Sequence, residues 1–273
     1  MRKPAAAALA AVCLFAVLLM TCQRAAKAEQ AGRAECVIEV SSRRILHEKD
    51  AMLPLPNAST TKIVTALIVI EDCFLSDEVV IPPEAEGVDG SCVYLRAGET
   101  YTVEALLYGL MLRSGNDAAA ALAIYHSGSV AAFAQVMNER VLLLGAEHTH
   151  FSNPHGLPDV AHHTTARDLA LITAAAMENE TFRAIVSAKR YAPYDWYNKN
   201  KLLSSFAGAC GVKTGYTVQA GRCLVSAAER EGALIVCVVL DCPPMYERSA
   251  QLLEAAFSSI GEERRGTEPS CGG

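Results

Sequence analysis

The two ends of this chain carry strand-like segments, and the stretch between them is helical. Near the start, residues 36–40 and 45–49 flank a polar turn and predict a hairpin. Near the end, consecutive antiparallel strands are predicted at 212–214, 222–228 and 233–240. Because strands this far apart in sequence must share one core, we expect an α/β (α+β) fold. One antiparallel sheet is assembled from both ends and flanked by helices, and a helical region at about 71–199 is inserted in it.

The middle of the 273-residue chain is rich in alanine and leucine at helical spacing. This pattern predicts four helices, at residues 103–112, 117–125, 131–144 and 167–177. A closing amphipathic helix is expected at 246–258, after Pro243-Pro244 stops the last strand. The polar residues from Gly261 onward are expected to be disordered.

The first 28 residues match the three regions of a secretory signal peptide. Arg2 and Lys3 precede an apolar run, and small residues follow it up to Ala28. We expect cleavage after Ala28, a mature unit at 29–262 with a polar tail at 263–273, and a location in the cell envelope or outside the cell. Two alternatives stay open: a lipid attached at Cys22, and an uncleaved segment that anchors the chain at its N-terminus.

Cysteine content and charge narrow the class of protein further. Of ten cysteines, Cys13 and Cys22 fall in the signal-like segment. The others are compatible with disulfides in an exported protein and equally with small buried thiols. The net charge of −6 is spread over interspersed acidic and basic residues, so we expect no nucleic acid partner.

The segment Ser59-Thr60-Thr61-Lys62 opens an apolar run that reaches Ile70 and predicts a helix buried on all sides. Positions three apart lie on one helical face, so the Ser59 hydroxyl and the Lys62 amine can meet. Lysine activates a serine as its base only if burial lowers its pKa, which an apolar helix can do. Taken alone, the tetrapeptide is better explained as a serine N-cap followed by an ordinary lysine.

Two further elements add to this one. Ser114-Gly115-Asn116 lies between two predicted helices, where a loop can present a hydroxyl and an amide to a cleft, although a helix stop and restart would explain it too. Lys213-Thr214-Gly215 lies on a predicted strand. A glycine in a strand allows the backbone of a ligand to approach closely, and a strand at the edge of a sheet can pair with an extended peptide. An exposed strand end is the simpler explanation of that segment.

The order Ser-x-x-Lys, Ser-x-Asn, Lys-Thr-Gly, each on a fitting type of element, is hard to attribute to chance. It is the set found in class A β-lactamases and penicillin-binding proteins. Longer segments narrow the resemblance: PNASTTK (56–62), LRSGNDAA (112–119), NPHGLP (153–158), HTTARD (163–168) and GVKTGYT (211–217). Through them, the chain resembles the serine-type D-alanyl-D-alanine carboxypeptidases, the low-molecular-mass penicillin-binding proteins.

The resemblance implies a β-lactamase/transpeptidase-like fold and removal of the terminal D-alanine from peptidoglycan stem peptides. It also implies covalent inhibition by β-lactams and no metal or organic cofactor. Members of this family often continue into a β-rich domain and a C-terminal membrane helix, whereas this sequence stops after the catalytic unit, so we expect membrane contact at most through the N-terminus. The implied catalytic residues are the nucleophile Ser59, its base Lys62 and a proton relay, Ser114. The implied substrate-binding residues are Asn116, Lys213, Thr214, Gly215 and Tyr216, with the backbone N–H groups of Ser59 and Tyr216 as the oxyanion hole.

Three other hypotheses are weighed against this one. A β-lactamase shares the three elements but needs a base for fast deacylation, for which Glu147 is a candidate. A catalytically silent penicillin-binding sensor could keep the fold, although it would be free to lose residues that are intact here. A zinc site is suggested by His148, His150, His155, His162 and His163. These histidines lack the helical spacing of a metalloprotease, and we interpret His155 and His163 as loop-structuring residues.

Overall fold

The computed structural model describes residues 32–267, with side chains up to residue 265. The expected signal peptide with Cys13 and Cys22, Cys271 and residues 268–273 lie outside this part of the chain.

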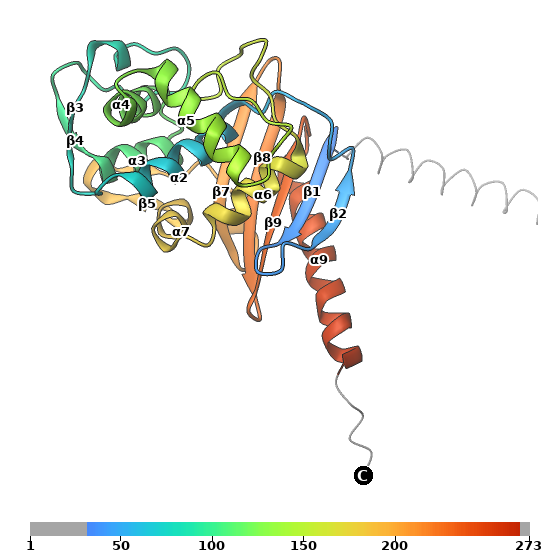
Figure 1. Cartoon of the computed structure of the whole chain (residues 1–273). Helices are drawn as coiled ribbons and strands as arrows, with labels where there is room; N and C mark the ends of the chain where they lie inside the picture. Colours follow the sequence, from blue (N-terminus) through green and yellow to red (C-terminus); the bar gives the residue numbers. More distant parts are fainter. Residues whose placement is uncertain (1–31, 268–273) are drawn as a thin grey trace, which may run out of the picture. The chain divides into compact units, whose positions relative to one another are not determined.

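A five-stranded antiparallel sheet with the order β2-β1-β9-β8-β7 forms the base of the fold (Figure 1). Its strands are β1 (Ala34–Glu39), β2 (Ile45–Lys49), β7 (Ala209–Thr217), β8 (Gly221–Arg230) and β9 (Ala233–Leu240). β1 pairs with β9 along its length, and Ala34 lies opposite Leu240. The predicted sheet, assembled from both ends of the chain with helices inserted between, is confirmed.

Side chains of the inner strands alternate between two buried faces. On β9, Val236 and Val238 pack into one core cluster, while Ile235 and Cys237 pack into another. α9 (Met245–Thr267) covers the second face, and α6 (Ala166–Ala176) and α7 (Glu180–Ser187) cover the first (Figure 1). Since both faces are buried, β9 is apolar throughout instead of alternating between apolar and polar residues.

The four helices predicted in the middle of the chain are confirmed to within one or two residues. They are α3 (Val103–Leu112), α4 (Asn116–Ser127), α5 (Val130–Leu143) and α6 (Ala166–Ala176). Side-chain oxygens of Thr102, Ser129 and Thr165 cap the first turns of α3, α5 and α6. α7 (Glu180–Ser187), capped by Asn179, follows as a helix that the sequence analysis did not predict.

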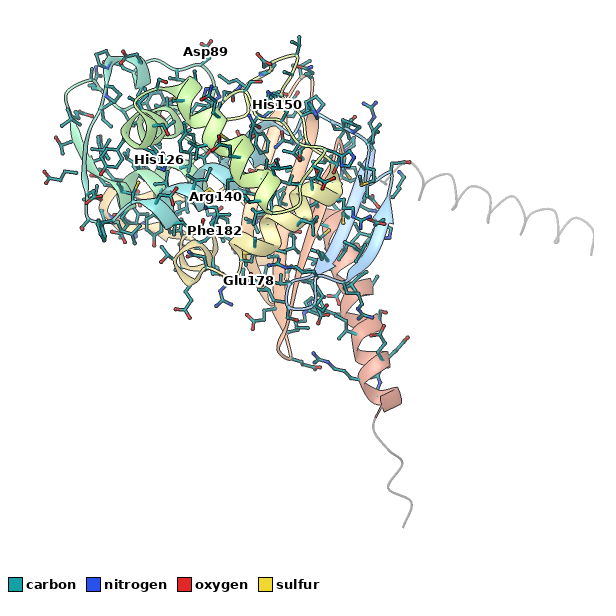
Figure 2. All side chains as sticks on the ribbon, viewed as in Figure 1. Asp89, His126, Arg140, His150, Glu178 and Phe182 are labelled. Atoms are coloured by element: carbon teal, nitrogen blue, oxygen red, sulfur yellow. The ribbon has the colours of Figure 1, made fainter. Side chains whose placement is uncertain are left out.

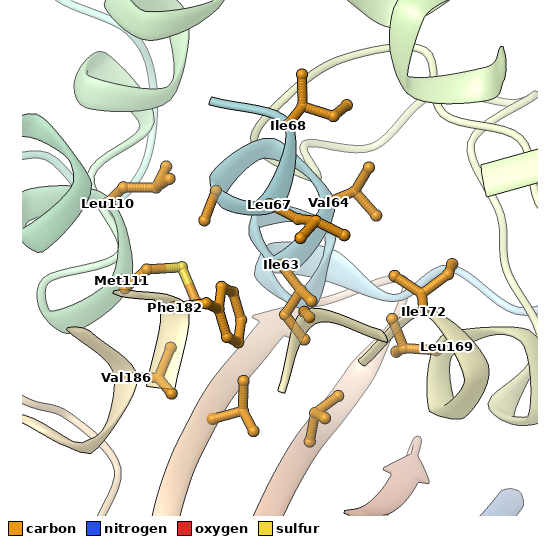
Figure 3. Close-up of a cluster of buried hydrophobic side chains, with 14 of the residues drawn as sticks. Ile63, Val64, Leu67, Ile68, Leu110, Met111, Leu169, Ile172, Phe182 and Val186 are labelled. Carbon is orange, nitrogen blue, oxygen red and sulfur yellow. The ribbon is translucent and has the colours of Figure 1, made fainter. Parts of the chain in front are cut away.

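α2 (Lys62–Asp72) is the central helix, and each residue from Lys62 to Val69 is buried. It packs against α3, α4, α5, α6 and α7, which confirms the helix predicted to be buried on all sides. Figure 3 shows side chains from this packing: Ile63, Val64 and Leu67 of α2 with Leu110, Met111, Leu169, Ile172 and Phe182 around them. Burying each such side chain contributes roughly 1.5–3 kcal/mol, so the start of α2 has a well-fixed position.

At its other end, α2 is tied to the helical region by surface charges (Figure 2). Glu71 and Asp72 accept hydrogen bonds from Arg140 on α5, and Asp72 also contacts His126 on α4 at 3.1 Å. These side chains are partly exposed, so each pair contributes little to stability, at most about 1 kcal/mol.

Several short elements and one helix end differ from the sequence prediction. The elements that were not predicted are β3 (Glu78–Val80), β4 (Thr100–Thr102), β5 (Arg190–Tyr191), β6 (Trp196–Tyr197), α8 (Leu202–Ser205) and the 3-10 turns η2 (Pro83–Ala85) and η3 (Ala192–Tyr194). α9 continues to Thr267, so the prediction that the helix ends at Ser258 and disorder starts at Gly261 is wrong. Residues 261–267 are polar, but polarity does not prevent an exposed final turn from staying helical.

The state of the cysteines and the apolar length of the helices can also be compared with the sequence expectations. Cys36, Cys223 and Cys237 are free thiols buried in the sheet. This agrees with the interpretation of the cysteines as small buried thiols, the alternative to disulfides. Within residues 32–267, no single helix is long and apolar enough to cross a membrane, although α4 and α5, bent by 83° at their junction, meet the length and composition test as a pair.

Candidate active site

Ser59 lies in η1 (Ala58–Thr61), a 3-10 turn that leads directly into α2. Before it, the buried Asn57 donates through Nδ2 to the hydroxyls of Thr60 (3.0 Å) and Thr61 (3.1 Å). Ala58 has a φ of +49°, in the left-handed region that costs an L-residue about 1–2 kcal/mol. The backbone next to Ser59 is therefore strained and is held by buried hydrogen bonds, a pattern common at functional sites.

Lys62, the first residue of α2, is fully buried and donates three hydrogen bonds through Nζ. They reach Ser59 Oγ at 3.0 Å, Asn116 Oδ1 at 2.6 Å and the backbone carbonyl of His155 at 2.7 Å. All three acceptors are neutral, so no carboxylate contacts the amine to offset a positive charge on it.

This environment lowers the pKa of two lysines. Burial lowers the pKa of Lys62 well below its ordinary value, and the positive charges of Lys213 and Lys199 lower it further. Burial also lowers the pKa of Lys213 to about 7, and Lys199 again contributes. The lowered pKa of Lys62 favours the neutral amine that a base requires.

Ser114 and Asn116 lie where α3 ends and α4 begins. Ser114 is another non-glycine residue with a positive φ, +65°. Asn116 joins three segments: Oδ1 accepts from Lys62, Nδ2 donates to the carbonyl of Asp89 at 2.6 Å, and its backbone N–H donates to the carbonyl of Ser91 at 2.7 Å. The Asn116 side chain is thus fixed beside the Ser59–Lys62 pair.

β7 brings the Lys-Thr-Gly segment against η1. A Cβ on Gly215 would lie only 2.9 Å from the carbonyl oxygen of Asn57 and 3.2 Å from the amide nitrogen of Ser59. The absence of a side chain there lets the strand pass directly beside the serine turn. Lys213 is buried at the same strand and donates to the carbonyl of Thr214 at 2.9 Å, while Tyr216 is exposed.

A cavity of about 280 Å³ opens onto these residues, and we call it the catalytic cavity. Five predicted site residues line it: Ser59, Ser114, Thr214, Gly215 and Tyr216. Lys62 and Asn116 stand behind Ser59 through the hydrogen bonds above. Five further residues that line the catalytic cavity were not predicted from the sequence: Ser91, Lys199, Arg222, Met245 and Tyr246. No Asp or Glu is among the described residues that line it, so its charged walls are cationic.

The histidine-containing loop supports the serine turn from the opposite side. His162 is buried; its Nδ1 accepts from the backbone N–H of Ser152 at 3.1 Å, so its Nε2 carries the proton and donates to Thr61 Oγ1 at 2.8 Å. Burial lowers the pKa of His162 to about 4, which keeps it neutral. His155 contributes the carbonyl to Lys62, and His163 bonds the carbonyl of Ala161 within the loop.

The same histidines were the basis of the zinc alternative. Over residues 32–267, no three His, Cys, Asp or Glu side chains are grouped so that they could hold a metal ion. The interpretation of His155 and His163 as loop-structuring residues agrees with their contacts, and His162 belongs with them. Glu147, the candidate lactamase base, is exposed and does not line the catalytic cavity.

Known proteins are similar to this chain over most of their length. A D-alanyl-D-alanine carboxypeptidase of Bacillus subtilis is 32% identical over 270 residues, covering 90% of this chain and 69% of the relative. One from a Streptomyces species is 39% identical over 71% of this chain and 75% of its own. The solved structure of a Streptomyces DD-transpeptidase superposes with a TM-score of 0.79 at 34% identity, covering 84% of this chain and 97% of that one.

A solved D-alanyl-D-alanine carboxypeptidase from Mycobacterium tuberculosis also has a TM-score of 0.79, at 31% identity over 84% of this chain and 91% of that one. These neighbours confirm the β-lactamase/transpeptidase-like fold. The family model described as D-alanyl-D-alanine carboxypeptidase matches residues 21–243. The chain belongs to the D-alanyl-D-alanine carboxypeptidase family of serine peptidases.

Proposed function

We propose that this chain removes the terminal D-alanine from peptidoglycan pentapeptide stems through an acyl-enzyme on Ser59. The observation that carries the proposal is the 3.0 Å contact between Ser59 Oγ and Lys62 Nζ, on a lysine whose pKa is lowered by burial. Family membership gives the reaction class, and the contacts around Ser59 support the part that we propose for each residue.

Acylation begins with proton transfer from Ser59 to Lys62. When Lys62 is neutral, its two N–H bonds point to Asn116 Oδ1 and the His155 carbonyl, and its lone pair is left for the Ser59 hydroxyl. Oγ then bonds to the carbonyl carbon of the penultimate D-alanine, and the peptide C–N bond breaks. The proton passes to the leaving amine with Ser114 as the relay, so that D-alanine departs neutralised.

The negative charge that develops on the carbonyl oxygen is held by the backbone N–H groups of Ser59 and Tyr216. The close approach of Gly215, the residue before Tyr216, to the backbone nitrogen of Ser59 supports this assignment. Removing one donor of this kind typically costs about 10²–10³ in rate.

The terminal carboxylate of the substrate is held by Lys213 and Thr214, and Asn116 holds the peptide group on the other side of the scissile bond. The cationic walls of the catalytic cavity, Lys199 and Arg222, favour an anionic substrate end. Water then attacks the ester, the C–Oγ bond breaks, and the proton returns to Ser59, which completes the hydrolysis.

The test is release of D-alanine from a pentapeptide that ends in D-alanyl-D-alanine, measured with Ser59→Ala beside it and with a chelator added in parallel. Ser258→Ala, an exposed serine on α9, is the matched control. We expect release that requires Ser59, is retained in Ser258→Ala and is unaffected by the chelator. Release that persists in Ser59→Ala would disprove the nucleophile assignment.

β-Lactams separate the carboxypeptidase from the lactamase and the silent sensor. We propose that penicillin adds its mass to Ser59 and stays attached, because the catalytic cavity offers no carboxylate to activate the water for fast deacylation. Intact-mass spectrometry over time measures the adduct. Rapid loss of the adduct would favour a lactamase, and a stable adduct without peptide turnover would favour a sensor.

Transfer to an amine is a second candidate activity, since a structure that matches this chain closely is named a DD-transpeptidase. In this case an amine attacks the same ester in place of water. Adding glycine or a D-amino acid to the assay separates the two: a new peptide product indicates transfer, and free tetrapeptide alone indicates hydrolysis.

The site of action follows from the substrate. We infer that residues 1–28 direct export and that residues 29–262 act as one catalytic unit on the outer side of the cytoplasmic membrane. The signal-like pattern of residues 1–28 supports this. N-terminal sequencing of the exported chain is the check: a start at residue 29 agrees with cleavage after Ala28, and a lipidated Cys22 contradicts it.

A further inference from the structure

A second cavity, of about 390 Å³, lies on the other side of the segment that carries Ser91. Ser91 lines the catalytic cavity, while its two neighbours in sequence, Gly90 and Cys92, line the second one. One stretch of chain around Ser91 thus forms a wall of both cavities. The remaining lining residues are Glu86, Gly87, Val88, Asp89, Tyr94, Leu95, Arg96 and Asp117.

The second cavity has a fixed position relative to Asn116. The Asp89 carbonyl accepts from Asn116 Nδ2 at 2.6 Å, and a Cβ on Gly90 would lie 2.7 Å from the same nitrogen. Asp117, the next residue along α4, accepts from the backbone N–H groups of Val93 (3.0 Å) and Leu95 (3.1 Å). The Asp117 carboxylate is therefore part of the frame that holds the wall, and it is not free to bind a ligand.

The charged groups that remain are of both signs and are exposed. The Arg96 guanidinium and the Asp89 carboxylate make no hydrogen bond or ion pair with the part of the chain that the structure describes. Figure 2 shows Asp89 at the outer edge of the helical region. Glu86 is exposed as well, but its Oε2 accepts from the Ala97 N–H at 2.9 Å. Tyr94 adds an aromatic ring that is 84% exposed.

We propose that the second cavity binds the side-chain end of a diamino acid in the stem peptide, one that carries both an ammonium and a carboxylate group. Arg96 binds the carboxylate and Asp89 the ammonium. The proposal rests on the function proposed above, because it takes Asn116 to hold the peptide group next to the acylated D-alanine. The residue that precedes this D-alanine then emerges at Asp89 and Gly90, one step of about 3.3–3.6 Å further along an extended peptide.

The side chain of that preceding residue enters the second cavity. A single cation or a single carboxylate would suit a simpler side chain. The presence of a free cation and a free carboxylate in one cavity fits a zwitterionic end, such as that of diaminopimelate, better than the lone ammonium of lysine.

The experiment compares kcat/KM for three pentapeptides that differ only in the residue before D-alanyl-D-alanine: meso-diaminopimelate, L-lysine and L-alanine. We expect the native enzyme to prefer the three in that order. In Arg96→Gln the ratio of diaminopimelate to lysine should fall about fivefold, the size of one exposed ion pair. In Asp89→Asn the ratio of lysine to alanine should fall by a similar factor. Arg183→Gln, on α7 and lining neither cavity, should leave both ratios unchanged.

Each outcome decides between the proposals. Equal kcat/KM for diaminopimelate and lysine in the native enzyme, or an unchanged ratio in Arg96→Gln, overturns the zwitterion site while the carboxypeptidase stands. Failure to release D-alanine from any of the three peptides counts against the proposed function itself. If Arg96→Gln loses activity on all three equally, Arg96→Lys decides: it keeps the charge and should restore the diaminopimelate preference if the site is real.

Discussion

Lys62, Lys199 and Lys213 place three amines near the half-buried Ser59. Each charge makes protonation of the next amine less favourable, which lowers the pKa of Lys62 and keeps its neutral form accessible. Lys199 differs from the other two because it is exposed at the wall of the catalytic cavity and donates to Ser91 Oγ at 3.3 Å. It can therefore be replaced without emptying the core.

Lys199→Gln should shift the acidic limb of acylation to higher pH. Removing this positive charge favours the protonated form of Lys62, so the pKa of Lys62 rises and less neutral amine is present at a given pH. The measurement is the rate of acylation by a β-lactam between pH 5 and pH 9. Lys189→Gln, a change at an exposed lysine outside the cavity, is the control. An acidic limb at the same pH in both variants would contradict the electrostatic role of Lys199.

Lys213→Met should make the protein more stable at neutral pH while it impairs catalysis. The folded pKa of Lys213 is about 7 against an ordinary value of 10.5, so between these values the unfolded chain binds the extra proton and stability rises with pH. A neutral side chain removes this cost, which we put at roughly 2–4 kcal/mol at pH 7.

The advantage of Lys213→Met should shrink as the pH approaches about 10.5, where the unfolded chain loses the same proton. Urea unfolding at pH 7 and pH 10 measures the difference in the free energy of unfolding between Lys213→Met and the native chain at each pH. Lys201→Met, at an exposed position, should show no such pH-dependent difference. A Lys213 variant that is less stable than the native chain at pH 7 would rule out this account.

At this scale, side-chain motifs were predictable and backbone partners were not. Ser59, Lys62 and Asn116 are recognised by residue type and spacing, and the structure brings them together. The third partner of Lys62 is the carbonyl of His155, a group that every residue has, so no residue type marks it. Lys199 and Arg222 are ordinary surface-type residues in the sequence, and only the tertiary fold turns them toward the cavity.

Among the elements, the loop that contains His155 and Gly156 presses directly on η1. Gly156 has a φ of +85°, and a Cβ there would lie 1.9 Å from the carbonyl oxygen of Ala58. The neighbouring Ala58 is itself strained, so the turn cannot move aside cheaply. The position of Ser59 thus depends on an element about a hundred residues further along the chain.

Gly156→Ala should reduce β-lactam acylation by about 100-fold or more, because a displacement near 1 Å at a reacting group costs on that order. Gly145→Ala is the matched control: Gly145 also has a positive φ, +80°, but nothing lies within 4 Å of the added Cβ. It should lose only about 1 kcal/mol of stability and keep its acylation rate. Equal acylation rates in the two variants would show that the contact with Ala58 is unimportant.

Long elements with a clear period were predicted, and short ones were not. α3 was placed to the residue because ten apolar-rich positions follow a cap at Thr102. β5 and β6 have two residues each and follow no period, and their aromatic side chains are held by contacts such as the 4.1 Å stack of Tyr191 on Tyr108. Such pairing depends on a partner far away in sequence, which a local pattern cannot contain.

For the molecule as a whole, one buried ion pair fastens the last helix to the first strand. Glu35 on β1 is fully buried and accepts from Arg248 on α9 through both carboxylate oxygens, each at 2.7 Å. Burial alone would raise the pKa of Glu35, but hydrogen bonds from Arg248, His47 and the Gly32 N–H lower it to about 2. The stability from this carboxylate is present above about pH 4.5 and is lost as the pH falls through 2.

Glu35→Gln should lower the free energy of unfolding by about 3 kcal/mol, because it leaves the partly buried guanidinium of Arg248 without its counter-charge. Glu254→Gln breaks an exposed pair with Arg230 and should cost less than about 1 kcal/mol. Urea unfolding at pH 7 compares the two. Similar losses in both variants would mean that α9 is not fastened through Glu35.

The overall architecture was within reach of the sequence, since strand patterns at 36–49 and 212–240 leave few ways to close a core around the helices between them. The catalytic cavity was not, because its walls combine residues from segments as distant as Ser59, Ser91 and Tyr246. No spacing rule connects such positions before the chain is folded.

Because β1 pairs with β9, the first strand to be synthesised can complete its pairing in the sheet only after the last strand has been made. Until about residue 240 has been made, β1 and β8 both lack β9 as their neighbour in the sheet. The part of the sheet that holds β7 beside Ser59 is then incomplete. A chain cut short during synthesis therefore offers bare strand edges to proteases and no assembled active site. The sheet that positions Ser59 is therefore complete only after β9, the last of its five strands, has been made.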